Sequence, residues 1–76
     1  MQHDLHTLLL QAKAEVFLDY VGKYGRLLDQ QLYRHVKQNY GIGRGDADKI
    51  INHLERSGRL SVVAKGFGVE LRRVAQ

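Results

Sequence analysis

Hydrophobic positions recur with a helical period in several segments of the chain, most clearly in its second half. Four apolar residues there are spaced i, i+3, i+4 and i+7: Ala47, Ile50, Ile51 and Leu54. Gly58 follows at the position of a typical helix stop. The pattern predicts an amphipathic helix over about residues 44–57, and either Gly43 or Asp46 can serve as its N-cap.

A longer helix is predicted near the start of the chain, over about residues 4–21, with Asp4 as its N-cap. Its apolar positions form two neighbouring rows: Leu5, Leu8, Leu9, Ala12, Val16 and Tyr20, then Leu10, Ala14, Phe17, Val21 and Tyr24. Two rows are more than one face of a three-helix core needs. The second row can pack under the C-terminal strands or meet another copy of the chain. The extra leucines at Leu5, Leu9 and Leu10, taken from both rows, are the candidate contacts of a homodimer.

Between these helices the sequence predicts a break, a short strand and a further helix. Gly22 and Gly25 mark the break, and residues 26–28, near Leu27, are expected to pair with a later hairpin. Asp29 is the expected cap of a helix over about residues 30–39. Its expected inward positions, with one in the following turn, are Leu32, Tyr33, Val36, Tyr40 and Ile42.

The C-terminal part alternates with period two over residues 59–64 and 69–74, around a turn with two glycines at residues 65–68. The predicted order is helix, short strand, helix, turn, helix, strand, strand. This order is that of an α+β winged helix-turn-helix with a two-stranded C-terminal wing, in one domain over residues 1–76.

Composition narrows the function. The 76 residues include no cysteine, which excludes disulfides and thiolate metal sites, and no run approaches the ~18 apolar residues of a membrane span. The start, MQHDLHTLLL, is not typical of a signal peptide, and a cytoplasmic location is expected. Net charge is +4; residues 1–43 carry five Lys and Arg against four Asp and Glu, and residues 44–76 carry seven against four. The basic excess lies where a nucleic-acid surface would need it, although a solvated surface has the same signature.

The chain from about residue 12 to residue 74 resembles the winged-helix family of transcription factors. The resemblance rests on four blocks: Val16-Phe17-Leu18-Asp19-Tyr20-Val21 before glycines, Leu28-Asp29 with Leu32 and Val36, Ile42, and Lys49-Ile50-Ile51-Asn52-His53-Leu54-Glu55-Arg56-Ser57-Gly58-Arg59-Leu60. Length and the bare domain make it similar to the small regulators of crenarchaeal viruses, plasmids and virus–plasmid hybrids. The pattern is more specific for the fold than for a target.

The predicted base-reading residues lie on the helix over residues 44–57, opposite its apolar stripe. Lys49 and Arg56 can donate to guanine O6 and N7, and Asn52 can bond adenine N6 and N7. Arg44 and His53 border this face, although His53 can equally pack on the second helix. The alternative is a solvated helix face.

The first turn of that helix departs from the family pattern. Asp46 and Asp48 stand where many recognition helices carry phosphate-bonding Ser or Thr, and carboxylates repel phosphate. Both suit the positive end of the helix dipole. Asp48 can also accept a hydrogen bond from cytosine N4, so it is a candidate for specificity rather than for affinity.

Positioning contacts are expected from the wing and the second helix. The wing offers Lys65, Phe67, Arg72 and Arg73, and the second helix offers Gln30, Gln31 and Arg34 toward phosphates. For Phe67 at the tip, folding back onto the hairpin is favoured over contact with sugar or a second subunit.

No catalytic group, metal site or cofactor site is expected. His3 and His6 lack a third ligand, and the serines lack a histidine–carboxylate arrangement. The sequence thus predicts a non-enzymatic, sequence-specific regulator that binds double-stranded DNA, with the third helix in the major groove. The alternative is a protein–protein interaction module on the same fold, which would need exposed aliphatic residues on that helix. RNA binding is less favoured, because the aromatics that stack unpaired bases are missing.

Overall fold

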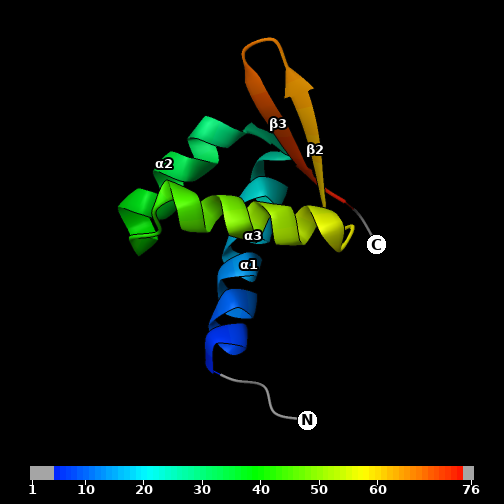
Figure 1. Ribbon diagram of the computed structural model, residues 1–76. Helices are drawn as coiled ribbons and strands as arrows, with labels where there is room; N and C mark the ends of the chain where they lie inside the picture. Colours follow the sequence, from blue (N-terminus) through cyan, green and yellow to red (C-terminus); the bar gives the residue numbers. More distant parts are fainter. Residues whose placement is uncertain (1–4, 75–76) are drawn as a thin grey trace.

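The computed structural model describes the backbone of residues 5–74 and the side chains of residues 11–74. It is a small α+β fold (Figure 1) whose elements follow in the order α1 (Leu5–Tyr24), β1 (Arg26–Leu28), α2 (Asp29–Tyr40), α3 (Arg44–Arg56), β2 (Leu60–Lys65) and β3 (Gly68–Arg73). This is the predicted order. α3 crosses α1, and the β2–β3 hairpin extends away from the helices (Figure 1).

The three strands form one antiparallel sheet in the order β1-β3-β2. The predicted short strand near Leu27 is therefore confirmed. Leu27 and Val62 both lie opposite Leu71, one on each side of β3, so these three side chains share the face that turns toward the helices. Leu71 is completely buried at the centre of that row. The sheet thus completes a core that three short helices could not close alone.

α1 is longer than predicted, because the break after it comes at Gly25 and not at Gly22. Gly25 has a φ of 79°, and its N–H donates to the carbonyl of Val21, which is a left-handed helix end. Gly22 lies inside the helix. A Cβ there would lie 3.1 Å from a side-chain carbon of Arg73, so this glycine allows β3 to approach α1 closely.

The side of α1 that faces the core is formed by the second predicted row together with Leu18, which neither row contained. Its buried members are Ala14, Phe17, Leu18 and Val21. Of the first row, Ala12 is exposed, while Val16 and Tyr20 are half-buried. Tyr24, expected in the second row, is 53% exposed in the last turn of α1, where the centre of its ring lies 5.0 Å from that of Tyr20. Leu5 to Leu10, the candidate homodimer contacts included, lie outside the described side chains.

Ile42 joins α2 to α3 as predicted: it is 6% exposed and fills the core between the two helices with Leu32 and Val36. Tyr40 does not point inward as expected but is 54% exposed, because the chain turns away from α2 at Gly41, whose φ is 67°. The N-cap of α2 is Leu28 rather than Asp29.

α3 begins after the N-cap Gly43, which settles the choice left open by the sequence. The predicted apolar stripe of Ala47, Ile50, Ile51 and Leu54 is buried. The helix ends in paired hydrogen bonds, from Gly58 N–H to Glu55 and from Arg59 N–H to Leu54, with Gly58 at a φ of 75°. This termination turns the chain directly into β2.

Candidate nucleic-acid interface

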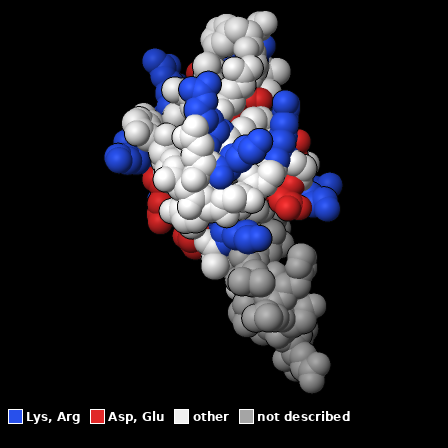
Figure 2. Space-filling model, turned by 90° about the vertical axis from the view of Figure 1, so that its left-hand side faces the viewer, with Lys and Arg blue, Asp and Glu red and all other residues white. Residues whose placement is uncertain are grey.

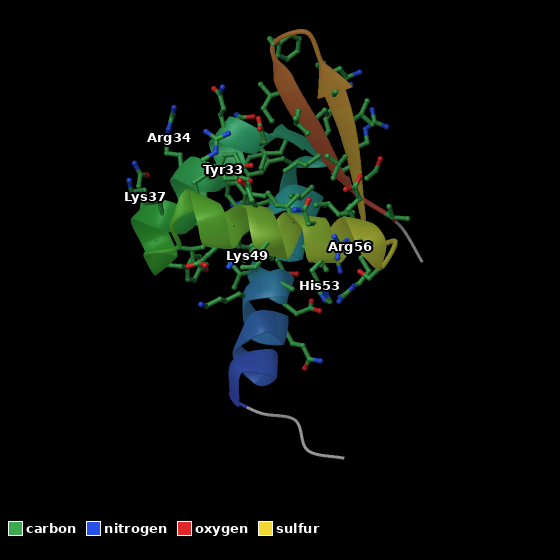
Figure 3. All side chains as sticks on the ribbon, in the orientation of Figure 1. Tyr33, Arg34, Lys37, Lys49, His53 and Arg56 are labelled. Carbon is green, nitrogen blue, oxygen red and sulfur yellow. The ribbon has the colours of Figure 1, made fainter. Side chains whose placement is uncertain are left out.

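The outer face of α3 carries cationic and amide side chains that no other described part of the chain covers. Lys49, Asn52 and Arg56 are exposed, whereas the opposite stripe of the same helix is buried. His53 is exposed as well and does not pack on α2. Figure 3 shows Lys49, His53 and Arg56 along α3, with Arg34 and Lys37 on the adjoining α2. The helix is therefore anchored by its aliphatic residues and free on its polar face.

A hollow of about 250 Å³ separates one flank of α3 from the sheet. It is lined by Asp29, Tyr33, Asp48, Ile51, Asn52, Val62, Val69 and Leu71. Asn52 and Asp48 therefore lie on the side of α3 that faces the β2–β3 hairpin. At 100° per residue, His53 lies on the other flank.

Asp48 is engaged within the protein. The Tyr33 hydroxyl on α2 donates a hydrogen bond to Asp48 Oδ1, and the guanidinium carbon of Arg44 lies 4.8 Å from the centre of the Tyr33 ring. Burial first, and then the hydrogen bond to Asp48, raise the pKa of Tyr33 to about 12, so at neutral pH the phenol keeps its proton and remains a donor. This cluster fixes the start of α3 on α2.

The pairing also alters the expected role of two predicted site residues. Asp48 is half-buried, and one of its oxygens is satisfied before any ligand arrives. Arg44 is exposed, but its guanidinium stacks on Tyr33. Sequence reasoning did not find Tyr33 as their partner, since Tyr33 and Asp48 are 15 positions apart and belong to different helices.

On α2, Gln31 has a structural role, because its side-chain oxygen accepts a hydrogen bond from the N–H of Leu28 and caps the helix. Gln30 and Arg34 are exposed, as a phosphate contact requires. Asp29 Oδ1 accepts from the N–H of Gln30 at 2.9 Å and from that of Val69 on β3 at 3.4 Å, so it ties α2 to the sheet.

Lys37, on the last turn of α2, is an exposed cation that the sequence analysis did not select. The sequence did contain a signal for it: Lys37 follows Arg34 by three positions, so the two cations lie on the same face of the helix. Figure 2 views the side of the molecule where α2 and the start of α3 lie. Lys and Arg side chains spread over the middle of that face, and Asp and Glu lie mostly toward its borders.

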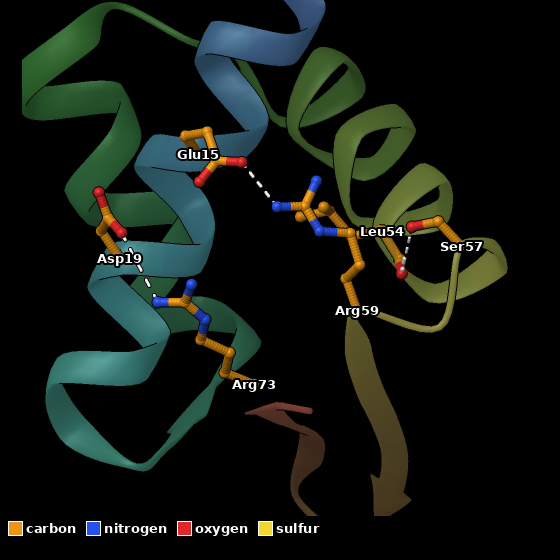
Figure 4. Close-up of polar contacts among 6 residues, drawn as sticks. All are labelled: Glu15, Asp19, Leu54, Ser57, Arg59 and Arg73. Carbon is orange, nitrogen blue, oxygen red and sulfur yellow. Dashed lines mark hydrogen bonds and ion pairs between the residues drawn. The ribbon is translucent and has the colours of Figure 1, made fainter. Parts of the chain in front are cut away.

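The two adjacent arginines of β3 point to opposite faces of the sheet. Arg72 lies 3.4 Å from Glu70 on the outer face, whereas Arg73 reaches Asp19 of α1 at 3.6 Å (Figure 4). Both side chains stay about half exposed, so these ion pairs add little stability. Arg26 of β1 lies opposite Arg72 in the strand register. The sequence analysis did not select Arg26 as a candidate contact, because only the pairing of β1 with β3 places it beside Arg72.

A shorter ion pair fixes the start of β2. Arg59 Nη2 lies 2.6 Å from Glu15 Oε1 of α1, and the Ser57 hydroxyl donates to the carbonyl of Leu54 in the turn before it (Figure 4). Arg59 therefore belongs to the scaffold that orients the β2–β3 hairpin.

The tip of the hairpin is exposed. Lys65 and Gly68 pair as the last residues of β2 and the first of β3, which leaves Gly66 and Phe67 as the turn. Phe67 is 72% exposed, so the favoured expectation that it folds back onto the hairpin is wrong. Lys65 is exposed beside it.

Comparisons with protein-family models, with curated proteins and with solved structures return no match for this chain. No helix within the described residues is long and apolar enough to cross a membrane. The described residues also hold no group of three or more His, Cys, Asp or Glu that could bind a metal ion, and His3 and His6 lie outside the described side chains.

Proposed function

We propose that this chain is a winged helix-turn-helix regulator that binds double-stranded DNA sequence-specifically, with α3 in the major groove and the β2–β3 hairpin as the wing. One observation carries the proposal: Lys49, Asn52 and Arg56 stand together on the uncovered face of α3. A helix that presents cationic and amide donors suits the acceptors that base edges expose in that groove.

The surrounding elements support the same orientation. Arg34 and Lys37 of α2 are exposed beside α3, where they can pair with phosphates without reading sequence (Figure 3). The β2–β3 hairpin extends away from the helices (Figure 1), and its exposed Lys65 suits the neighbouring backbone or minor groove. Base reading is thus assigned to α3, and positioning is assigned to α2 and the wing.

The internal partners refine the predicted base-reading set. Lys49, Asn52, His53 and Arg56 are exposed, and the structure gives them no side-chain partner among the described residues. Asp48 and Arg44 are held by Tyr33. We therefore assign Asp48 a secondary role: its remaining oxygen can accept from cytosine, and the bond to Tyr33 limits its freedom to turn away from phosphate.

The second candidate, a protein-interaction module, fits α3 less well. Docking through this helix would require exposed aliphatic residues, and its aliphatic residues are buried. The large exposed apolar side chains lie elsewhere in the described part of the chain: Tyr24, Tyr40, Val63, Phe67 and Val74. The face of α3 therefore favours nucleic acid over a protein partner.

The experiment selects duplexes from a random pool and measures their binding by fluorescence anisotropy over a range of salt. The expected log affinity falls linearly with log salt, at about −0.9 per phosphate neutralised. Lys49→Ala and Asn52→Ala should each lose about 1–3 kcal/mol at one base pair and flatten the preference there.

Lys23→Ala is the matched control, because Lys23 is an exposed lysine in the last turn of α1 and lines a hollow formed only by residues of α1 and α2. It should keep the base preference of the wild type. Absence of duplex binding at low salt, or an unchanged base preference in both α3 variants, would reject the groove assignment.

A further inference from the structure

The tip of the wing carries an apolar side chain for which the fold has no internal use. Phe67 is 72% exposed, the largest exposure among the large hydrophobic residues of the described chain. It is not among the half-buried residues that pack against the core. A phenylalanine left in water forgoes the stabilisation that burial gives, so its contribution is available to a complex.

The shape of the tip suits insertion into a narrow space. Phe67 occupies a two-residue turn with Gly66, and Gly68 follows it as the first residue of β3. Neither glycine carries a side chain beside the ring. A Cβ built at Gly66 would meet no atom within 4 Å, whereas one at Gly68 would lie 3.3 Å from Asp29 Oδ1 of α2, so the tip is open on the Gly66 side. Figure 1 shows the hairpin projecting beyond the helices, so the ring is carried at the far end of the wing.

An exposed cation stands directly before the ring. Lys65, directly before the turn, is exposed, and Glu70 of β3 lies 3.4 Å from Arg72. The nearest carboxylate is that of Asp29 on α2, which accepts hydrogen bonds from the N–H groups of Gln30 and Val69. It lies on the Gly68 side of the turn, so the cation stands on the Gly66 side. A thin apolar tip with a cation at its base matches a minor groove, which is about 6 Å wide and lined by phosphates.

Resting on the proposed function, we propose that Phe67 is a wedge that enters the minor groove next to the α3 site, partly unstacks one base step and bends the duplex. Apolar side chains inserted in this way open a step and kink DNA toward the major groove. The wedge would favour a flexible pyrimidine–purine step, so it adds specificity at a position that no hydrogen bond reads.

The energetics determine which measurement is informative. Burying the ring is favourable and unstacking a step is unfavourable, and the two terms are of similar size. Phe67→Ala should therefore change affinity by less than about tenfold while it abolishes the distortion. The slope of log affinity against log salt should stay as in the wild type, because no charge is removed.

The test places 2-aminopurine at successive positions of a selected duplex and measures its fluorescence, with the bend measured by energy transfer between the duplex ends. Wild type should raise the fluorescence at one step beside the α3 site and shorten the end-to-end distance. Phe67→Ala should lose both effects, and Phe67→Leu, which keeps an apolar wedge, should retain part of both. Val63→Ala is the matched control, since Val63 is an exposed apolar residue of the same hairpin away from its tip.

The outcomes separate this inference from the proposed function. If Phe67→Ala binds the duplex and distorts it as wild type does, the wedge is refuted and DNA binding by α3 stands. A wild-type complex with no fluorescence change at any position also refutes the wedge alone. If wild type binds no duplex at all, the proposed function fails first and the wedge fails with it.

Discussion

Tyr33→Phe should loosen the attachment of α3 to α2 without altering the core. The substitution removes only the hydroxyl that donates to Asp48 and leaves the ring beneath the Arg44 guanidinium, 4.8 Å away. A hydrogen bond to a charged group contributes about 1.5–3 kcal/mol, but Asp48 is only half-buried and water can replace part of the lost bond. We expect a loss of about 1 kcal/mol in the free energy of unfolding.

In a domain of this size that loss corresponds to a decrease of roughly 4–8 °C in Tm. Thermal unfolding followed by circular dichroism measures the shift, and Tyr40→Phe is the control because that tyrosine is 54% exposed. A double-mutant cycle with Asp48→Ala isolates the pairwise term. If the double variant loses only the sum of the two single losses in unfolding free energy, or if Tyr33→Phe is as stable as the control, the hydrogen bond does not hold α3.

The Tyr33 hydroxyl also gives stability a pH dependence, because its burial first, and its hydrogen bond to Asp48 second, raise its pKa. Tyr33 has a pKa of about 12 in the folded chain, above the ordinary value of 10.0, so folding favours the protonated phenol. For a group with a raised pKa, the stabilisation is fully present below the unfolded-state value and is lost as pH rises through the folded-state value. The stability difference between wild type and Tyr33→Phe should stay constant up to about pH 9 and shrink as pH rises from 10 to 12. A difference that is independent of pH through this window contradicts the assignment.

Three further predictions concern the scaffold and the oligomeric state. Leu54→Ala removes a completely buried side chain of α3 and should cost about 2–5 kcal/mol of unfolding free energy in urea denaturation, whereas an unchanged midpoint would contradict its core position. Gly58→Ala should lower the free energy of unfolding by about 1–2 kcal/mol through backbone strain at a φ of 75°. Steric clash does not contribute, because a Cβ there would meet no atom within 4 Å, and a gain in stability would argue against a left-handed helix end. The predicted homodimer through α1 should give twice the chain mass in light scattering. Val16 lies in an apolar hollow shared with Tyr40 and Ile42, so Val16→Glu should return the mass to that of a monomer. A monomeric wild type would contradict the dimer hypothesis.

The sequence by itself determined the elements and their order. The stripe from Ala47 to Leu54 is buried as its spacing predicts, and Ile42 fills the core at the turn. The alternating residues 59–64 and 69–74 form the hairpin, with shifts of about one residue at its ends. These features are local: periodicity alone decides which side of a helix or strand is apolar. The candidate polar face of α3 follows from the same rule, because it is the complement of the buried stripe.

Tertiary structure alone decided which side chains meet. Leu18 entered the core and Tyr40 left it, because the crossing of α1 by α3 and the turn at Gly41 set the direction of each helix face. The bond from Tyr33 to Asp48, the stacking of Arg44 and the position of Arg26 opposite Arg72 join residues from different elements. No local pattern encodes such pairings, since they depend on how helices and strands are oriented in space. The exposure of Phe67 belongs to the same class, because only the extended hairpin shows that its ring finds no partner within the described chain.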